Sequence, residues 1–411
     1  MSNVYLNPRV AALFVLGFAS GLPLALTSGT LQAWATVEQV SLRDIGFLTL
    51  VGSAYTLKFL WAPFIDRYTV PFLGRRRGWM ALSQLLLGVS IAAMGLFNPS
   101  HQLGVIALLA VFVAFMSATQ DIAFDAYSTD VLRAQERAAG AAVKVLGYRL
   151  AMIVSSGFAL VIADQWLGWN GMYMLMGALM LACAIATFLA PEPERVVSAP
   201  HSLREAVVAP LLAFFKRPEA ISILVLIVLY KLGDAFAGAL STTFLIRGAG
   251  FSATEVGTVN KIFGLAATII GALVGGGLMA KLGLYRSLML FGLLQAVSNF
   301  GYWWLSVSEP NLWFMGAVVA IENLCGGMGT AAFVALLMAL CHQQFSATQF
   351  ALLSALSAVG RTYLAGPLTP LFVEHLGWST FFIITVLLAL PGLWLLWRKR
   401  HIILALDANS H

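Results

Sequence analysis

Charged residues are scarce in this 411-residue chain: Asp, Glu, Lys and Arg fill 10% of the positions, whereas hydrophobic residues fill 60%. A soluble domain carries about 25% charged residues, most of them on its surface. So little charge cannot cover a core of this size, which excludes an ordinary soluble protein. Apolar stretches of about 20 residues, long enough to cross a bilayer core about 30 Å thick, recur between short polar breaks. The natural solvent of the chain is therefore lipid.

The chain also lacks the motifs of several function classes. It has no glycine-rich phosphate-binding loop, no metal-ligand triad and no hydrolase nucleophile motif. Its three cysteines, Cys183, Cys325 and Cys341, stand in or at the ends of apolar segments, without metal-ligand spacing or a disulfide pattern. We therefore expect a protein that is not an enzyme, with no cofactor and no metal, whose cysteines are small core residues.

The expected fold class is all-α, because lipid cannot hydrogen-bond a bare backbone and the chain lacks the alternating polarity of a β-barrel. The polar breaks predict about twelve transmembrane helices, near residues 9–36, 44–66, 79–97, 103–130, 140–164, 169–190, 219–247, 255–280, 286–306, 311–341, 349–374 and 379–397. We expect a six-helix bundle over 1–190, a cytoplasmic linker over 191–218, a second six-helix bundle over 219–397 and a cytoplasmic tail over 398–411. The first helix begins after very few residues and has no cleavage site, so we expect it to be retained rather than removed as a signal peptide.

The basic residues divide unevenly between the two sides of the expected membrane. Loops on one side hold sixteen of the 24 Lys and Arg residues, and the opposite loops hold only Arg43 and Arg247. The positive-inside rule then places both termini and the linker in the cytoplasm, as in a multi-pass protein of a bacterial inner membrane. Because this topology explains the net charge of +6, we expect membrane lipid and no nucleic acid as a partner.

The two halves echo each other in sequence. Residues 136–149 and 348–361 each open the fifth helix of their half, and each segment ends at an arginine, Arg149 or Arg361. Parallel six-helix halves are typical of major facilitator transporters, which hold substrate near the midplane between the halves. Carriers of this build usually work as monomers, so we expect a monomer.

A charged loop joins the second and third expected helices. It resembles the loop signature of the major facilitator class, although six residues separate Arg67 from Gly74 here. An acidic group at a helix end can pair with the arginines and brace the cytoplasm-closed state. In the alternative reading, the arginines only enforce topology. The expected conformational loop comprises Asp66, Arg67, Gly74, Arg75, Arg76 and Arg77.

Several ionisable residues fall inside expected helices. Each costs about 2.5–3.5 kcal/mol at the bilayer centre, so each marks a functional site by default. Asp121 and Asp125 are four apart and share one helix face, and Lys231 and Asp234 are three apart, which suits a local ion pair. The candidate proton-coupling residues are Asp121, Asp125, Asp234 and Glu322, among which we favour Asp125 over Asp121.

The basic residues of the helices outnumber the acids, which suits a substrate that carries carboxylates. Lys58 and Lys261 both fall in the second helix of their half. Lys144 lies about one turn from a loop and can extend to the interface, so Arg149 is the better intramembrane cation. Amides and aromatic rings offer hydrogen bonds and stacking faces of the kind that sugars and peptides need. The candidate substrate-binding residues are Gln32, Tyr55, Lys58, Gln120, Tyr127, Arg149, Lys231, Lys261, Asn299, Asn323 and Arg361.

Over nearly its whole length the chain resembles the AmpG-type muropeptide permeases of the major facilitator superfamily. The resemblance rests on residues 17–34, 117–127, 229–236, 322–329 and 345–361. It implies proton-coupled import of N-acetylglucosaminyl-1,6-anhydro-N-acetylmuramyl peptides from periplasm to cytoplasm, with muropeptide and protons as partners, in a recycling pathway that feeds β-lactamase induction. Some members carry further helices after the twelfth, whereas here Arg398–Arg400 leads into a short polar tail, so we expect any function of those helices to be absent.

Two other readings stay open. The buried charges can hold helices together in a membrane scaffold or sensor that transports nothing. Alternatively, the same fold can carry another anionic solute or a drug.

Overall fold

The computed structural model describes residues 7–71, 73–132, 137–192, 215–216, 219–340 and 346–408. These residues form helices joined by short turns, with no strand among them, which confirms the all-α prediction. The chain divides into two compact units, one made of Met1–Val40 and Val51–His201 and the other of Ser41–Leu50 and Ser202–His411. Residues 41–50, which we expected in the first bundle, thus pack with the second unit.

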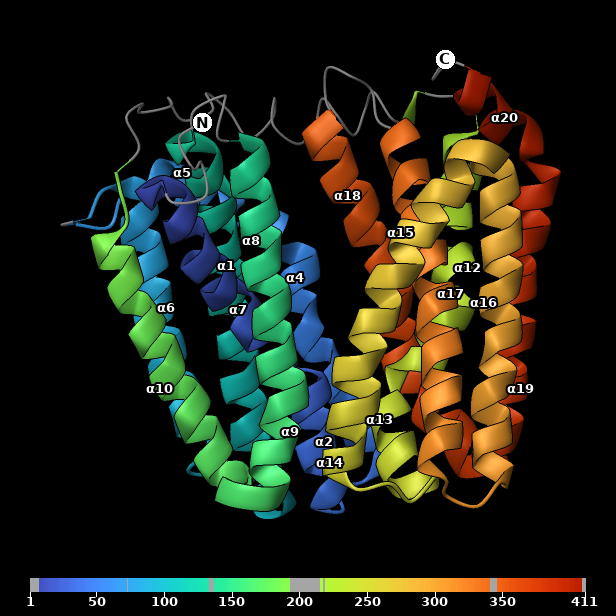
Figure 1. Ribbon diagram of the computed structural model, residues 1–411, viewed down its shortest axis with the longest axis horizontal. Coiled ribbons are helices and arrows are strands. Elements are labelled where there is room, and N and C mark those ends of the chain that lie inside the picture. The colour runs from blue at the N-terminus through green and yellow to red at the C-terminus, as the bar shows by residue number, and fades with distance from the viewer. Residues whose placement is uncertain are drawn as a thin grey trace. The chain divides into compact units, whose positions relative to one another are not determined.

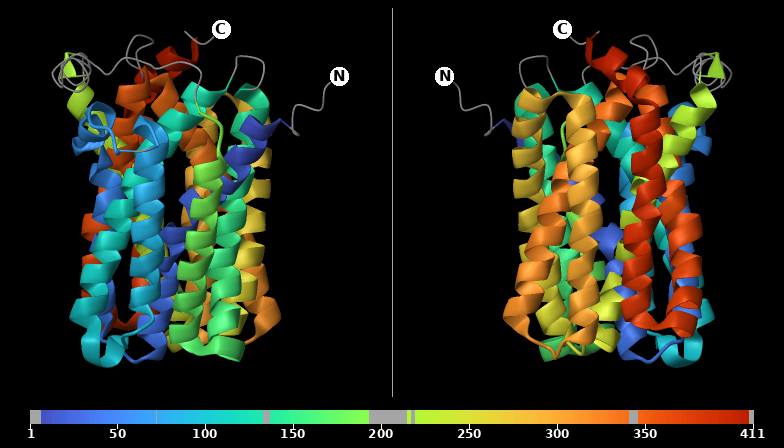
Figure 2. Two further views of the ribbon diagram at one scale, coloured as in Figure 1. Left: turned by 90° about the vertical axis from the view of Figure 1, so that its left-hand side faces the viewer. Right: turned by 90° about the vertical axis from the view of Figure 1, so that its right-hand side faces the viewer.

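In the first unit, long helices run side by side (Figure 1 and Figure 2). The helices of this unit, long and short, are α1 (Pro8–Leu26), α2 (Gly29–Val37), α4 (Ser53–Leu57), α5 (Ala62–Arg67), α6 (Arg75–Met94), α7 (Pro99–Val131), α8 (Arg137–Met152), α9 (Ala159–Ile162) and α10 (Gly168–Leu189), with a 3₁₀ turn η3 (Lys58–Leu60) and π-helical segments η5 (Ile153–Phe158) and η6 (Ala163–Leu167).

The second unit is a similar bundle. It contains α3 (Leu42–Leu48), α12 (Ala220–Ala239), α13 (Ser241–Thr243), α14 (Ala253–Glu255), α15 (Gly264–Leu282), α16 (Leu284–Val307), α17 (Leu312–Ala339), α18 (Ser346–Val359), α19 (Gly366–Arg398) and α20 (Arg400–Ala408), with π-helical segments η8 (Phe244–Gly248), η9 (Val256–Phe263) and η11 (Gly360–Ala365). A short 3₁₀ helix, η2 (Thr49–Gly52), continues α3.

Helices of the described residues account for each of the twelve expected membrane segments. The second, for example, is built from the pieces between Leu42 and Arg67, and the first breaks after Leu26, three residues beyond Pro23. Eight stretches of the described chain are long and apolar enough to cross a membrane, and two of these, Val143–Leu189 and Leu352–Arg398, are 47 residues long and hold two expected helices each. The count of twelve is consistent with this arrangement.

Four glycines mark equivalent turns in the two units. Gly74, Gly168, Gly283 and Gly377 have φ between 66° and 77° with ψ between 166° and 178°, a backbone region that only glycine adopts readily. Gly283 follows Gly74 by 209 positions, and Gly377 follows Gly168 by the same 209. The backbone therefore repeats with this period, and each glycine lets a helix start directly after the preceding turn.

The end of the chain differs from the polar tail that we expected. Residues 400–408 form α20, and its Ile403 is buried in the core of the second unit. Lys399 Nζ lies 2.5 Å from Glu219 Oε2, just before α12, and His401 Nε2 lies 3.8 Å from Glu219 Oε1. The hydrogen bond from Lys399 lowers the pKa of the Glu219 carboxyl. The segment up to Ala408 is therefore docked on the bundle.

Two of the three cysteines lie within the described residues. Cys183 and Cys325 are buried with free thiols, as core residues would be. Cys341 lies outside the described residues.

We predict that Gly377→Ala lowers stability by about 1–3 kcal/mol, because alanine is strained at φ 75° even though no atom lies within 4 Å of the added methyl group. Thermal unfolding of the detergent-solubilised protein measures the loss. The matched control is Gly276→Ala in α15, where the methyl group also enters open space and the backbone is helical. Equal melting temperatures for the two variants would contradict the prediction.

Candidate functional site

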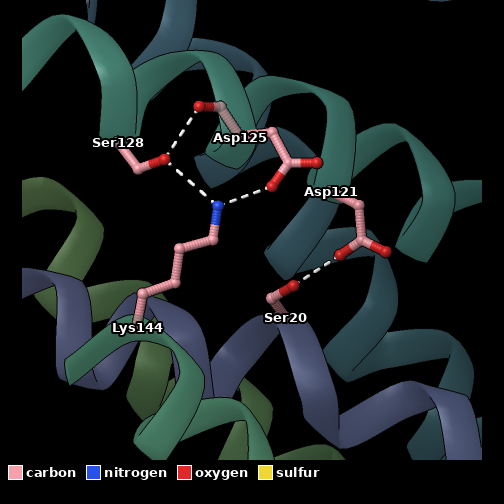
Figure 3. Close-up of polar contacts among 5 residues, drawn as sticks. All are labelled: Ser20, Asp121, Asp125, Ser128 and Lys144. Atoms are coloured by element: carbon pink, nitrogen blue, oxygen red, sulfur yellow. Dashed lines mark hydrogen bonds and ion pairs between the residues drawn. The ribbon is translucent and has the colours of Figure 1, made fainter. Parts of the chain in front are cut away.

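The first unit holds a cluster of polar side chains from three helices (Figure 3). We call Ser20 of α1, Asp121, Asp125 and Ser128 of α7, and Lys144 of α8 the first polar cluster. Ser20 Oγ donates to Asp121 Oδ1 at 2.5 Å. Lys144 Nζ lies 2.6 Å from Asp125 Oδ1 and 3.1 Å from Ser128 Oγ. The two carboxylates of one helix face thus have different partners.

Close packing of α1 against α8 sets the position of Lys144. A methyl group at Gly17 would lie 2.5 Å from the Lys144 carbonyl oxygen, and one at Gly21 would lie 2.6 Å from the Tyr148 carbonyl oxygen. Only glycine permits this approach. The two glycines of α1 therefore act in packing and bring Lys144 within reach of α7.

The electrostatic surroundings of the two carboxylates also differ. Asp121 is half-buried and interacts with Lys58 and Lys144 at longer range. Asp125 is 57% exposed, while its partner Lys144 lies 4.7 Å from the centre of the Phe124 ring. An aromatic face and a carboxylate together stabilise the ammonium group.

The structure places the other expected residues of the first unit in different settings. Lys144, not Arg149, supplies the ion pair with Asp125, and Arg149 is exposed on α8. Gln120 is buried, and neither its amide nitrogen nor its amide oxygen has a hydrogen-bond partner among the described residues. Gln32 is buried, and Tyr55 interacts electrostatically with Asp121.

Tyr127 belongs to the hydrophobic core of the first unit. Its side chain is fully buried and packs in a cluster with Leu13 and Met80. Its hydroxyl donates to the Pro191 carbonyl oxygen at 2.6 Å. The substrate-binding role that we expected for Tyr127 has no support in this packing.

Two arginines of the expected conformational loop hold helices of the first unit together. Arg76 Nε lies 3.4 Å from Asp130 Oδ2 of α7, and both side chains are about a tenth exposed, at 12% and 11%. Arg77 donates from Nη2 to the Phe188 carbonyl oxygen at 2.7 Å and from Nε to that of Thr187 at 3.3 Å. It therefore caps the C-terminal end of α10, where a cation is favoured.

These contacts give the two arginines a role beyond topology. Gly74 adopts the glycine-only conformation that starts α6. The side chains of Asp66, Arg67 and Arg75 lie outside the described set, so a role for them stays a prediction.

The second unit holds a larger polar group, which we call the second polar cluster: Lys231 and Asp234 of α12, Lys261 of η9, Tyr302 of α16, and Glu322 and Asn323 of α17. Lys231 Nζ lies 3.4 Å from Asp234 Oδ2 and 3.2 Å from Thr330 Oγ1. Lys261 Nζ donates to Thr242 Oγ1 at 2.7 Å. The pair that the i, i+3 spacing predicted is present.

Glu322 is held by neutral groups. Tyr302 Oη donates to Glu322 Oε2 at 3.4 Å, and Asn323 Nδ2 donates to the same oxygen at 2.9 Å. Asn323 Oδ1 accepts from Thr268 Oγ1 at 2.9 Å. Asp234, Lys231 and Lys261 all interact with Glu322 electrostatically.

Two candidate substrate-binding residues of the second unit lie on π-helical segments. Lys261 is in η9 and Arg361 is in η11, and the two charges interact. π-helical turns widen a helix locally and often occur at functional sites. Arg361 is exposed within its unit.

Lys58 and Lys261 are not equivalent in register. Ser41 caps α3 with Asp44 three residues on, and Ser252 caps α14 with Glu255 three residues on, so these caps align the two second helices. Lys58 lies 17 positions after its capping serine, whereas Lys261 lies 9 after its own. Although both lysines lie in the second helix of their half, their positions along that helix therefore differ by about two turns.

Sequence reasoning missed the hydroxyl partners. Ser20, Ser128, Thr242 and Thr330 complete the two clusters, and a serine or threonine inside an apolar helix gives little sign of the helix it will face. Ser128 alone had a local signal, since it lies three residues after Asp125 and shares its helix face.

Comparison with known proteins identifies relatives of the whole chain. The sequence profile described as Major Facilitator Superfamily matches residues 13–363. The protein of Escherichia coli strain K12 named anhydromuropeptide permease is 64% identical over 400 residues, which cover 96% of this chain and 81% of that protein. A Rickettsia felis protein named putative transporter AmpG 4 is 32% identical over 408 residues, covering 96% and 97%.

Solved structures show the shared fold. The inward-facing, unoccupied form of a bacterial homologue of the human lysosomal transporter Spinster superposes with a TM-score of 0.78 at 16% identity, covering 99% of each chain.

We predict that Asp130→Asn lowers stability by about 3 kcal/mol, because it leaves the largely buried Arg76 without its carboxylate. Thermal unfolding in detergent measures the loss. Replacing both residues by apolar ones, Arg76→Met with Asp130→Leu, should recover most of it, and Glu309→Gln, in an exposed turn, should change nothing. A double variant less stable than Asp130→Asn would refute this account of the pair.

Proposed function

The chain belongs to the AmpG-type branch of the Major Facilitator Superfamily, and on that premise we propose that it imports cell-wall muropeptides, N-acetylglucosaminyl-1,6-anhydro-N-acetylmuramyl peptides. Membership in this superfamily makes the chain a transporter and not an enzyme. The observation that carries the proposed substrate is the 64% identity, over 400 residues, to a protein named anhydromuropeptide permease.

The charges of the two units support an anionic substrate. The helical segments of the first unit carry three candidate cations, Lys58, Lys144 and Arg149, and two candidate acids, Asp121 and Asp125. Those of the second unit carry Lys231, Lys261 and Arg361 with Asp234 and Glu322. Each unit therefore has one surplus positive charge when all these groups are ionised. Peptide carboxylates of a muropeptide would offset that surplus, and its sugars would use the amide and hydroxyl groups.

We further propose that import is coupled to protons. Among the described residues, Asp125 and Asp234 take part in ion pairs within 4.0 Å, whereas Asp121 and Glu322 accept only from neutral groups at hydrogen-bond distance. A half-buried carboxyl without a contacting cation tolerates its neutral form better than an ion-paired one. This favours Asp121 and Glu322 as the groups that bind and release the proton, in place of our preference for Asp125.

The ion pairs would then respond to the proton carriers. Neutralising Asp121 removes an anion that acts on Lys144, and neutralising Glu322 removes one that acts on Lys231 and Lys261. These lysines, no longer attracted by the neutralised acid, could then attract carboxylates of the substrate. Proton binding and substrate binding would thus favour each other in each unit.

The cellular setting that we propose follows from the loop charges and the family. Sixteen basic residues against two support a multi-pass protein of the inner membrane with cytoplasmic termini. We propose that it acts as a monomer, and that the imported fragments feed peptidoglycan recycling and β-lactamase induction.

Proteoliposomes that are acidic outside should accumulate labelled anhydro-muropeptide, because the inward proton gradient drives symport. A protonophore should reduce uptake to equilibration. Competition with sugar-only, peptide-only and complete ligands tests the alternative of a carrier for another anionic solute or drug. Uptake that is unchanged by the protonophore would disprove proton coupling. Failure of the complete ligand to compete would disprove the proposed substrate.

We predict that Asp121→Asn abolishes accumulation but keeps substrate exchange between equilibrated compartments, because asparagine still accepts from Ser20 and cannot carry a proton. Glu309→Gln, in an exposed turn, is the control and should transport normally. Fluorescence size-exclusion profiles check folding and abundance. Normal accumulation by Asp121→Asn would remove this residue from the coupling mechanism, and loss of the folded protein would support the scaffold reading.

A further inference from the structure

The corner between α19 and α20 carries three consecutive basic residues with different surroundings. Lys399 is held inside the protein, because its Nζ lies 2.5 Å from Glu219 Oε2. The residues on either side of it, Arg398 and Arg400, are exposed. Among the described side chains, no carboxylate oxygen lies within 4.0 Å of either guanidinium group. The corner therefore presents two cations that the described part of the protein does not neutralise.

Each of the two arginines lies over an exposed tryptophan. The Arg398 guanidinium carbon lies 5.3 Å from the centre of the Trp394 ring, and that of Arg400 lies 5.9 Å from the centre of the Trp397 ring. The attraction between a cation and an aromatic face restricts where the guanidinium group lies. Because the ring supplies no oxygen acceptor, the N–H donors of both arginines stay available to a ligand.

The two tryptophans end an apolar stripe along α19. The residues of the stripe follow at spacings of three, four and three, so they share one helix face, and each is 48–56% exposed. They are Leu387, Leu390, Trp394 and Trp397. In a membrane protein such a stripe contacts acyl chains, and tryptophan at its end marks the level of the lipid headgroups. The two free cations follow directly after that level.

The other side of the corner is fixed by packing. The backbone N–H of Lys399 donates to the Leu395 carbonyl oxygen at 2.9 Å and ends α19. In α20, which contacts α16 and α17, Ile403 is buried in the core of the second unit, and His401 Nε2 lies 3.8 Å from Glu219 Oε1. The arginines therefore project from a folded corner, and little chain order has to be created when a ligand binds.

We propose that this corner binds an anionic phospholipid, with the headgroup phosphate on Arg398 and Arg400 and the acyl chains along the exposed stripe of α19. Charge complementarity selects this occupant, because a zwitterionic lipid offers the same apolar contact without a net negative charge. The guanidinium group also fits phosphate geometry, since its parallel N–H donors can bind two oxygens together. Such a site depends neither on the transported substrate nor on proton coupling.

Native mass spectrometry of the detergent-solubilised protein, titrated with phosphatidylglycerol or with phosphatidylcholine of the same acyl chains, measures the preference. The wild type should bind a first phosphatidylglycerol more tightly than phosphatidylcholine. Arg398→Gln with Arg400→Gln should weaken phosphatidylglycerol binding about 25-fold, because each basic residue near an anionic headgroup strengthens binding about fivefold. Binding of phosphatidylcholine should not change.

The matched control is Lys281→Gln with Arg286→Gln. It removes two exposed basic residues near the turn between α15 and α16 and leaves the corner intact, so it should bind phosphatidylglycerol as the wild type does.

Substitution of the tryptophans tests the aromatic contact. Trp394→Leu with Trp397→Leu keeps an apolar stripe but removes both rings, which should weaken phosphatidylglycerol binding about fivefold. Phenylalanine at both positions restores an aromatic face and should recover most of that loss.

Photo-crosslinking locates the lipid. Phosphatidylglycerol with a photoactivatable headgroup should label residues 394–404 of the wild type and label them less in the double arginine variant. Glycerol 3-phosphate at the same concentration should not reduce the labelling, because it has no acyl chains to bind the stripe. The wild-type labelling tests the site even where a substitution disturbs folding, which size-exclusion profiles check.

Four results would overturn the proposal. Equal binding of the two lipids by the wild type would show no headgroup preference, and equal losses in the arginine variant and in the Lys281–Arg286 control would show only general attraction. Labelling confined to other segments would place the lipid elsewhere. Displacement by glycerol 3-phosphate would show a site for a soluble phosphate instead of a lipid.

Discussion

The structure depends on one constraint: a charge surrounded by apolar helices must find its partners inside the bundle, because lipid offers none. Lys144 meets Asp125 and Ser128, and Lys231 meets Asp234 and Thr330. The close helix contacts serve this need, since Gly17 and Gly21 bring α8 near enough for Lys144 to reach α7. The packing of small residues and the pairing of charged ones are therefore one design.

The sequence predicts the features that depend on residues close together along the chain. The all-α fold and the twelve helical segments follow from apolar length, and the Lys231–Asp234 pair follows from a spacing of three. Partners on different helices do not follow, because the direction of a helix face depends on the packing of its neighbours. We favoured Arg149 over Lys144 for this reason. The distance of each residue from the nearest loop can be read from the sequence, but the close packing of α8 against α1, which lets Lys144 reach Asp125, cannot.

The two units are more alike in backbone conformation than in the positions of their charged residues. Glycine turns repeat at 209 positions, and serine caps begin both second helices. The charged clusters do not repeat: both acids of the first polar cluster lie on α7, whereas those of the second polar cluster lie on α12 and α17. Turn geometry tolerates almost no substitution, while a polar group can move along a helix if its partner moves too. The two units therefore keep the same turns and helix starts, while each has its own arrangement of charged side chains.

The carboxylates differ in whether a cation contacts them, and this difference is the physical basis of the proton-binding roles that we propose. An acid fixed by a contacting cation holds helices together through its ion pair, whereas one fixed only by hydroxyl or amide groups can keep its hydrogen bonds whether it is charged or neutral. Asp121 beside Ser20 and Glu322 beside Tyr302 and Asn323 are of the second kind. Each lies near an ion pair of the first kind. In the proposed proton coupling, a proton that binds Asp121 or Glu322 changes the field on a nearby cation without breaking a contact, so that the proton and an anionic substrate would bind together.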